Sequence, residues 1–102
     1  MDTDQLISHS RARFEHEAAR RTLREKYQAK STFAHAGGMW QAGPELLSTL
    51  NCCVMDRDVV LLDLYHNPVK VNTKTLWNLA AERWQEQMNA WLVEYEQLNR
   101  NR

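Results

Sequence analysis

The most regular pattern of apolar residues in this sequence covers residues 73–99. Apolar side chains recur at alternating spacings of four and three, and these positions are Trp77, Ala81, Trp84, Met88, Trp91, Tyr95 and Leu98. In a helix, a seven-residue repeat of this kind places all of its members in one stripe. The stretch contains no Gly or Pro, and Asn72 or Thr73 can cap its start by accepting a backbone N–H. The pattern predicts a long amphipathic helix over residues 72–99.

A second helical pattern covers residues 4–30, within an N-terminal segment of residues 1–30, and Thr3 or Asp2 can cap it. Opposite charges stand four residues apart, for example Arg13 with Glu17 and Arg21 with Glu25. Its apolar stripe is thin and consists of Ala12, Ala19, Leu23 and Tyr27. Such a helix is either solvated on most sides or completed by a neighbour.

Residues 31–58 are predicted to form a junction followed by a short helix. Two breaker pairs, Gly37–Gly38 and Gly43–Pro44, interrupt regular structure. The apolar residues Phe33, Met39 and Trp40 are expected to anchor the junction against the core. Pro44 suits the first position of a helix that runs to Asn51, because the N–H that proline lacks would be unpaired there anyway. Its buried side would be Leu46, Leu47 and Leu50.

Residues 59–71 are predicted to form a β-hairpin. The first strand would run from Val59 to Tyr65, and the shorter return strand would be residues 69–71. His66, Asn67 and Pro68 between them have the composition of a turn. Two strands alone are marginally stable in water, so this hairpin must rest on a helix or pair with a further strand. If that strand came from another molecule, the hairpin edge would be an interface.

Together these elements predict a single α+β domain spanning residues 1–102. Two long helices and one short helix would pack around a small antiparallel hairpin. Each long helix would measure about 40 Å at 1.5 Å per residue. A compact domain of this length is only about 33 Å across, so the molecule is expected to be elongated.

The composition is that of a folded protein with no charge bias. The sequence is 43% hydrophobic and 25% charged, and its formal net charge is zero, which disfavours a dedicated nucleic-acid binder. No apolar run approaches 18 residues, so no membrane contact is expected, and the acidic N-terminus does not resemble a signal peptide. The only cysteines, Cys52 and Cys53, are adjacent, which favours a reducing compartment.

No catalytic residue, metal site or cofactor is predicted. The cluster of Asp56, Asp58, Asp63 and His66 matches no calcium loop or zinc motif. A thiol–imidazole pair between Cys52 or Cys53 and a histidine has no supporting signature. The glycine pair at residues 37–38 lacks the Lys-Ser/Thr of a phosphate-binding loop. The expectation is therefore a protein that is not an enzyme.

The aromatic stripe is the candidate partner-binding surface, comprising Trp77, Trp84, Met88, Trp91, Tyr95 and Leu98. A stripe like this is most often intramolecular core. The alternative is that its C-terminal part, Trp91, Tyr95 and Leu98, contacts another chain. The thin stripe of the N-terminal helix is too small to cover seven large positions, and buried Trp and Tyr are frequent interface anchors.

The arginines of the N-terminal helix support an alternative in which it contacts phosphates. They are Arg11, Arg13, Arg20, Arg21 and Arg24. Glutamates interleave with them, and residues 1–30 carry seven basic and five acidic side chains, a net charge of +2. A solvated helix with mixed charges is the commoner meaning of such a pattern.

Two regions of the sequence carry a resemblance to a known group of proteins. One is residues 11–26 followed by FAHAGGMW at residues 33–40, and the other is LDLYHNPVKV at residues 62–71, leading into a helix with ERWQE at residues 82–86. The chain resembles small proteins encoded by contractile-tailed bacteriophages, especially those of marine cyanobacteria. The resemblance implies a viral origin and a role as a virion or assembly component, and it assigns no catalytic residue.

The sequence thus leads to two hypotheses about function. The first is a non-enzymatic structural or assembly protein of a phage neck, tail or baseplate, located in the virion or the host cytoplasm. Its partners would be other protein chains, either copies of itself or other virion proteins. The alternative is a small nucleic-acid-binding or regulatory protein that uses the Arg-rich helix.

Overall fold

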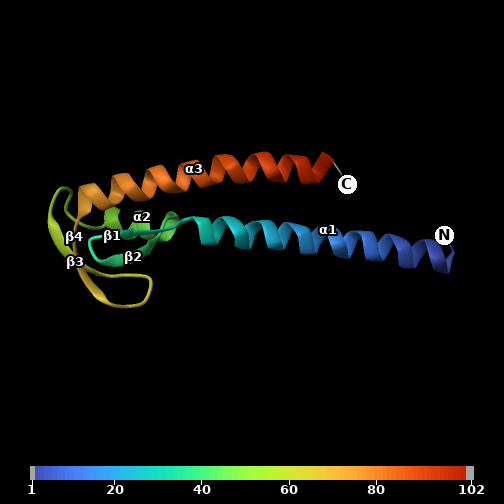
Figure 1. Cartoon of the computed structure of the whole chain (residues 1–102), viewed down its shortest axis with the longest axis horizontal. Helices are drawn as coiled ribbons and strands as arrows, with labels where there is room; N and C mark the ends of the chain where they lie inside the picture. The colour runs from blue at the N-terminus through green and yellow to red at the C-terminus, as the bar shows by residue number, and fades with distance from the viewer. Residues whose placement is uncertain (1, 101–102) are drawn as a thin grey trace.

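The computed structural model describes residues 2–100 and has a small head from which two long antiparallel helices project (Figure 1). Its principal extents are 64 × 24 × 21 Å and its radius of gyration is 19.1 Å. A compact domain of this length would have a radius of gyration of about 13 Å. The predicted α+β class and the elongated shape are therefore confirmed.

The two long helices are α1 (Thr3–Lys30) and α3 (Thr73–Arg100), each of 28 residues. The start of each long helix is capped by a side chain that was among the candidates predicted from the sequence. The Asp2 carboxylate accepts the Gln5 backbone N–H at 2.8 Å, and the Asn72 side-chain oxygen accepts the Thr75 backbone N–H at 3.1 Å. At its other end α1 stops at Ser31, whose hydroxyl donates to the Tyr27 carbonyl at 2.8 Å.

The head contains the predicted short helix α2 (Pro44–Asn51), which begins at the proline as expected. The buried core lies between α2, the first turns of α3 and the strands. Its members are Phe33, Trp40, Ala42, Leu50, Val71, Leu76 and Ala80. The start of α3 is fixed to the loop after α2 through Thr73, whose hydroxyl donates to the Val54 carbonyl at 2.8 Å and accepts the Arg57 N–H at 3.1 Å.

The predicted hairpin is present as β3 (Asp58–Leu62) and β4 (Pro68–Asn72), paired antiparallel. Its register places Val59 opposite Val71 and Leu61 opposite Val69. These residues turn toward the core, while the alternate residues of β3, Val60 and Leu62, are exposed. The prediction that the first strand reaches Tyr65 is wrong. The strand ends at Leu62 because the next side chain, Asp63, binds backbone N–H groups of the turn.

A second hairpin joins α1 to α2, where the sequence predicts only a junction. It consists of β1 (Thr32–His35) and β2 (Gly38–Gln41), with Phe33 opposite Trp40. The two residues at its tip, Ala36 and Gly37, both have positive φ, 54° and 84°. Such two-residue turns match the twist of antiparallel strands. The expected anchors Phe33 and Trp40 are indeed buried, and Met39 is half-buried.

The buried carboxylate of Asp63 connects the two hairpins, which form separate two-stranded sheets. It accepts backbone N–H groups from Asn67 at 2.9 Å and Tyr65 at 3.0 Å in its own turn, and from Met39 in β2 at 3.2 Å. The Leu64 N–H also donates to the Met39 carbonyl at 2.7 Å. A side chain at Gly38 would obstruct this approach, because its Cβ would lie 3.0 Å from Val69 Cγ2.

These hydrogen bonds, above all the one from the Asn67 N–H, lower the pKa of Asp63 from its ordinary value of 3.8. The ionised carboxylate therefore stabilises the folded state above pH 3.8. That contribution declines as the pH falls below 3.8 and is lost once the pH has passed through the lowered pKa of the folded protein.

We expect Asp63→Asn to lower the melting temperature at pH 7 by several degrees, because an amide offers one acceptor oxygen where the carboxylate offers two. The deficit relative to wild type should shrink as the pH falls below 3.8. Thermal unfolding followed by circular dichroism between pH 2 and pH 7 measures both effects. Asp58→Asn, at an exposed position on β3, is the matched control and should change the melting temperature little. A deficit that stays constant with pH would contradict this role of the Asp63 charge.

Candidate protein-binding surface

Only the first part of α3 is buried in the head. Its buried residues are Thr73, Leu76 and Ala80, and from Ala81 to Arg100 no residue of this helix is buried. The core therefore ends after two turns of a helix that is about 42 Å long at 1.5 Å per residue. The remaining turns carry only half-buried and exposed residues, of which Trp84 still packs against the core.

The members of the predicted stripe accordingly have different surroundings. Trp77 and Trp84 are half-buried and pack against the core of the head. Trp91 and Leu98 are half-buried farther along α3, whereas Met88 is 39% exposed and Tyr95 is 37% exposed. The sequence predicted that Trp91, Tyr95 and Leu98 are the part that contacts another chain. In the structure Trp91 is used within the chain, in a helix–helix contact, whereas Tyr95 lies with Met88 on a more open side.

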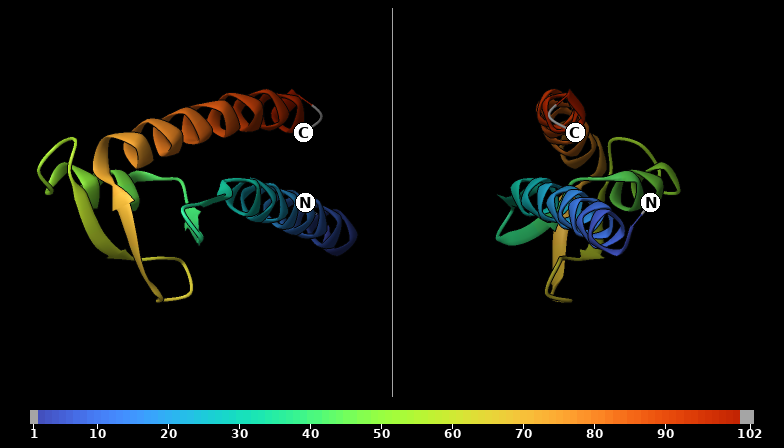
Figure 2. Two further views of the ribbon diagram at one scale, coloured as in Figure 1. Left: turned by 60° about the vertical axis from the view of Figure 1, so that its left-hand side comes forward. Right: turned by 90° about the vertical axis from the view of Figure 1, so that its right-hand side faces the viewer.

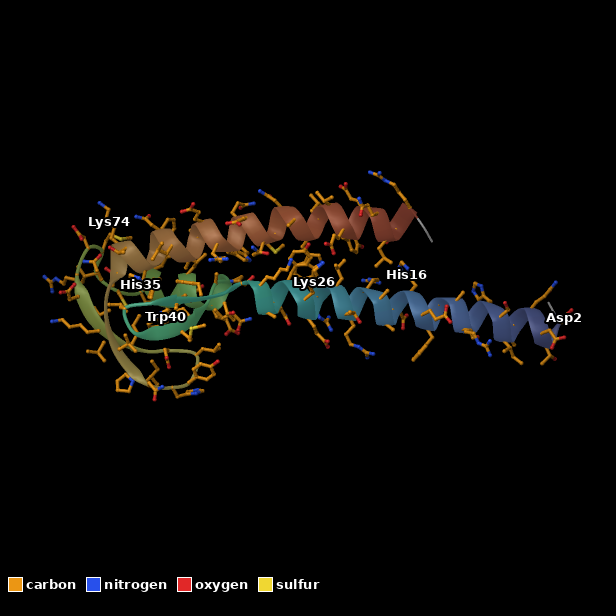
Figure 3. All side chains as sticks on the ribbon, viewed as in Figure 1. Asp2, His16, Lys26, His35, Trp40 and Lys74 are labelled. Atoms are coloured by element: carbon orange, nitrogen blue, oxygen red, sulfur yellow. The ribbon has the colours of Figure 1, made fainter. Side chains whose placement is uncertain are left out.

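The helix–helix contact joins one side of α3 to the C-terminal half of α1. The rings of Tyr27 and Trp91 stack with centroids 6.1 Å apart and planes inclined by 7°. Beside them the Lys26 ammonium donates to both carboxylate oxygens of Glu94, at 2.8 and 3.1 Å. This hydrogen bond lowers the pKa of Glu94 and raises that of Lys26. Figure 3 shows Lys26 on the side of α1 that faces α3.

The side of α3 that adjoins this contact is less covered, and we call it the open face, defined by Met88, Leu92 and Tyr95. These residues stand four and three apart, so they form a continuous apolar strip along the helix. Leu92 is 54% exposed, more than either neighbour. Leu92 was absent from the predicted partner-binding set because it lies beside the strict seven-residue repeat. Its exposure depends on which side α1 covers, which the repeat does not specify.

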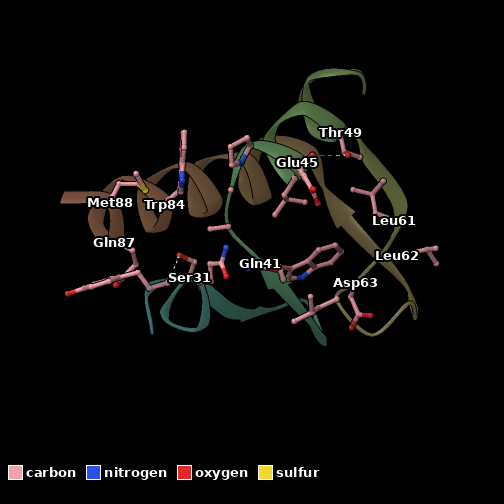
Figure 4. A pocket seen from close by; sticks show the side chains of 18 of the residues that line it. Ser31, Gln41, Glu45, Thr49, Leu61, Leu62, Asp63, Trp84, Gln87 and Met88 are labelled. Carbon is pink, nitrogen blue, oxygen red and sulfur yellow. Dashed lines mark hydrogen bonds between the residues drawn. The ribbon is translucent and has the colours of Figure 1, made fainter. Parts of the chain in front are cut away.

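A groove of about 920 Å³ continues the open face toward the head (Figure 4). Trp84 and Met88 of α3 form one wall. The other walls come from the end of α1, from β2, from α2 and from the end of β3, and include Tyr27, Trp40 and Leu61. The uncovered apolar surface of α3 is thus not confined to three residues but leads into the head.

A second groove, of about 410 Å³, lies between α1 and α3. Three of the five arginines considered for phosphate contact, Arg20, Arg21 and Arg24, line it together with Trp91 and Tyr95. Arg11 lies farther toward the N-terminus, as does Arg13, whose guanidinium is 3.6 Å from the Glu17 carboxylate in an exposed pair. The structure therefore brings part of the basic cluster against aromatic rings and leaves the rest on the helix surface.

The N-terminal half of α1 extends beyond the end of α3, and only Phe14 at its inner end lines the groove between the two helices. α3 ends at about the level of His16 (Figure 3), and every residue of segment 3–15 is exposed. We call this segment the free half of α1. It exposes three large apolar side chains, Leu6, Ile7 and Phe14. An isolated helix of this length is only marginally stable in water, so the free half would gain stability from any surface that covers it.

Another apolar patch lies at the opposite end of the molecule, on the outer face of the β3–β4 hairpin. Val60 and Leu62 project from β3, and Tyr65 is exposed in the turn that follows. Figure 2 shows this hairpin standing out from the head, away from α3. Apolar surface is therefore exposed at both ends of a molecule 64 Å long.

Within residues 2–100, no group of three or more His, Cys, Asp or Glu side chains is arranged to hold a metal ion. Cys52 and Cys53 are free thiols. None of the helices among these residues has the length and apolar character needed to span a membrane. No known protein family, curated protein or solved structure matches the chain.

We expect Trp91→Ala to loosen α1 from α3, because a stacked aromatic pair contributes about 0.5–1.5 kcal/mol beyond its buried area. Backbone amides in residues 16–30 should then exchange about two- to tenfold faster in hydrogen-exchange mass spectrometry. Leu92→Ala, one position along the helix on the open face, is the control and should leave these rates unchanged. Unchanged exchange in Trp91→Ala would mean that the stack does not hold α1 in place.

Proposed function

We propose that this chain is a non-enzymatic structural or assembly protein that works by contact with other protein chains. The observation that carries the proposal is the open face of α3. Met88, Leu92 and Tyr95 stay more than a third exposed on a helix whose adjoining side is already occupied by α1. Fully burying one large apolar side chain is worth about 1.5–3 kcal/mol, so covering three that are partly exposed would stabilise a complex appreciably.

The distribution of apolar surface agrees with such a role. The free half of α1 lies toward one end of the molecule, the outer face of β3–β4 lies at the other, and the open face lies between them. An elongated molecule that exposes an apolar patch near each end can contact two neighbouring proteins at once. This property suits a component that bridges larger proteins.

The proposal also includes where the protein acts. The resemblance to small proteins of contractile-tailed phages supports a component of the neck, tail or baseplate, present in the virion or in the host cytoplasm before assembly. The partners would be copies of this chain or other virion proteins.

Site-specific photo-crosslinking tests this proposal. A photoreactive amino acid at Leu92 should crosslink the chain to another protein in purified particles. At Val93 it should crosslink much less. The two positions are equally exposed, 54% and 55%, but adjacent residues point about 100° apart around a helix. Absence of the chain from particles, or equal crosslinking at both positions, would refute the proposed role of the open face.

A second candidate function is nucleic-acid binding, favoured by the groove in which Arg20, Arg21 and Arg24 lie beside Trp91 and Tyr95. Grooves that combine cationic side chains with aromatic rings are typical of proteins that bind single strands. The zero net charge of the chain weighs against strong binding of this kind.

Salt dependence separates the two candidates. If the groove binds single-stranded nucleic acid, replacing Arg20, Arg21 and Arg24 with Gln should reduce the slope of log K against log salt by about 2, at about 0.7 per lost phosphate contact. The matched control replaces three exposed basic residues of the head, Arg57, Lys70 and Lys74. No retention of wild type on single-stranded DNA or RNA at low salt would eliminate this function.

A further inference from the structure

We propose that the free edge of β3 pairs with the same edge of β3 in a second copy of this chain. The two strands would run antiparallel about a twofold axis at Val60, so the two hairpins would form one four-stranded sheet. This inference rests on the proposed function, contact with other protein chains, and it names one partner and the backbone groups that bind it.

The register of the β3–β4 hairpin shows which backbone groups of β3 are free. Beyond the two ends of the strand pair, the Asp63 N–H donates to the Asn67 carbonyl at 3.0 Å and the Thr73 N–H donates to the Arg57 carbonyl at 2.9 Å. In an antiparallel pair, hydrogen-bonded residues alternate with residues whose N–H and C=O groups point away from the partner strand. The outward-pointing residues of β3 are therefore the intervening ones, Asp58, Val60 and Leu62.

No strand among residues 2–100 occupies this edge. β3 belongs to a two-stranded sheet in which β4 is its neighbour, and no other backbone hydrogen bond of these residues involves Asp58, Val60 or Leu62. All three residues are exposed. Figure 2 shows β3 as the strand of this hairpin that lies farther from α3. Such a row of unpaired N–H and C=O groups is a template for a strand of another chain.

The other edge of the hairpin is closed to pairing. The outward-pointing positions of β4 include Pro68, opposite Leu62, and Lys70, opposite Val60. Proline has no N–H to donate, and both proline and lysine on an edge strand are common means of preventing association between sheets. The hairpin thus carries protecting residues on β4 and apolar residues at the corresponding positions of β3.

The sequence of β3 is that of a strand with neighbours on both sides. Residues 59–62 are Val-Val-Leu-Leu, an apolar run without alternation. A strand with one solvated face normally alternates apolar and polar residues, whereas a continuous apolar run is typical of an interior strand. Yet Val59 and Leu61 are only half-buried, and a sheet of two strands is marginally stable in water. A further strand on the free edge would cover these residues.

The free edge of β3 is complementary to itself. With Val60 opposite Val60 of the second copy, Asp58 of each copy lies opposite Leu62 of the other, and every outward N–H and C=O of both strands finds a partner. On the inner face, Leu61 of each copy lies beside Val59 of the other, an apolar pair of the kind that stabilises sheets. The two Asp58 carboxylates are four residues apart, about 13 Å along the strands, so no like charges face each other. This symmetry makes a second copy the partner that fits the edge.

Sedimentation equilibrium of the purified full chain tests the inference. Between about 10 and 500 µM, the wild type should approach twice its monomer mass of 12.0 kDa. Val60→Pro should weaken dimerisation at least tenfold, because it removes an outward N–H at the twofold axis but no hydrogen bond to β4. Lys70→Pro, at the position opposite Val60, removes an outward N–H from the other edge and is the matched control. It should leave the dimer intact, and far-ultraviolet circular dichroism verifies that both variants fold.

The register has its own test, which does not depend on a proline. In a chain with Cys52→Ser and Cys53→Ser, Val60→Cys should form disulfide-linked dimers under mild oxidation, because directly opposed residues have Cα atoms about 5.5 Å apart, within the reach of a disulfide. Lys70→Cys in the same background should not.

Three results would overturn the self-pairing. They are a wild type that is monomeric at 500 µM, equal dimerisation of Val60→Pro and Lys70→Pro, and equal disulfide formation at positions 60 and 70. Crosslinking of Leu92 to a different protein in particles would, in each case, leave the proposed function standing.

Discussion

The contact between Tyr27 and Trp91 controls what this molecule exposes. It holds α1 against one side of α3, with the Lys26–Glu94 hydrogen bonds beside it. A helix has a limited circumference, so an apolar stripe covered from one side stays open on the other. The open face, the groove that leads from it toward the head and the free half of α1 all follow from where this contact sits along the two helices.

The head sets the position of that contact. α1 enters it through the β1–β2 hairpin, and α3 leaves it directly from β4, so the two hairpins fix the separation and direction of the helices. The hairpins are joined through the Asp63 carboxylate and the close approach at Gly38. A few buried polar bonds in a small core thus determine the geometry of helices about 42 Å long. The head thus fixes the geometry, and the long helices present an exposed surface rather than enclose a site.

Much of the fold could be predicted from the sequence, and the features that could not be predicted have physical causes. Both long helices, the helix from Pro44 and the β3–β4 hairpin follow from apolar periodicity and local caps. The β1–β2 hairpin was missed because its turn uses Ala36 at positive φ, where Asn or Gly is the usual signal. The early end of β3 depends on Asp63, whose bonds to Tyr65, Asn67 and Met39 cannot be inferred from strand propensity.

The sequence by itself determined that this chain carries a long aromatic stripe and a polar, arginine-rich helix, because periodicity and charge are local properties. Only the tertiary structure decided which part of the stripe is used internally. Trp77 and Trp84 border the core, Trp91 stacks on Tyr27, and Met88 and Tyr95 remain open together with Leu92. The physical reason is that exposure depends on the direction from which a distant segment approaches. That direction is set by the hairpins of the head and not by the spacing of residues along the helix.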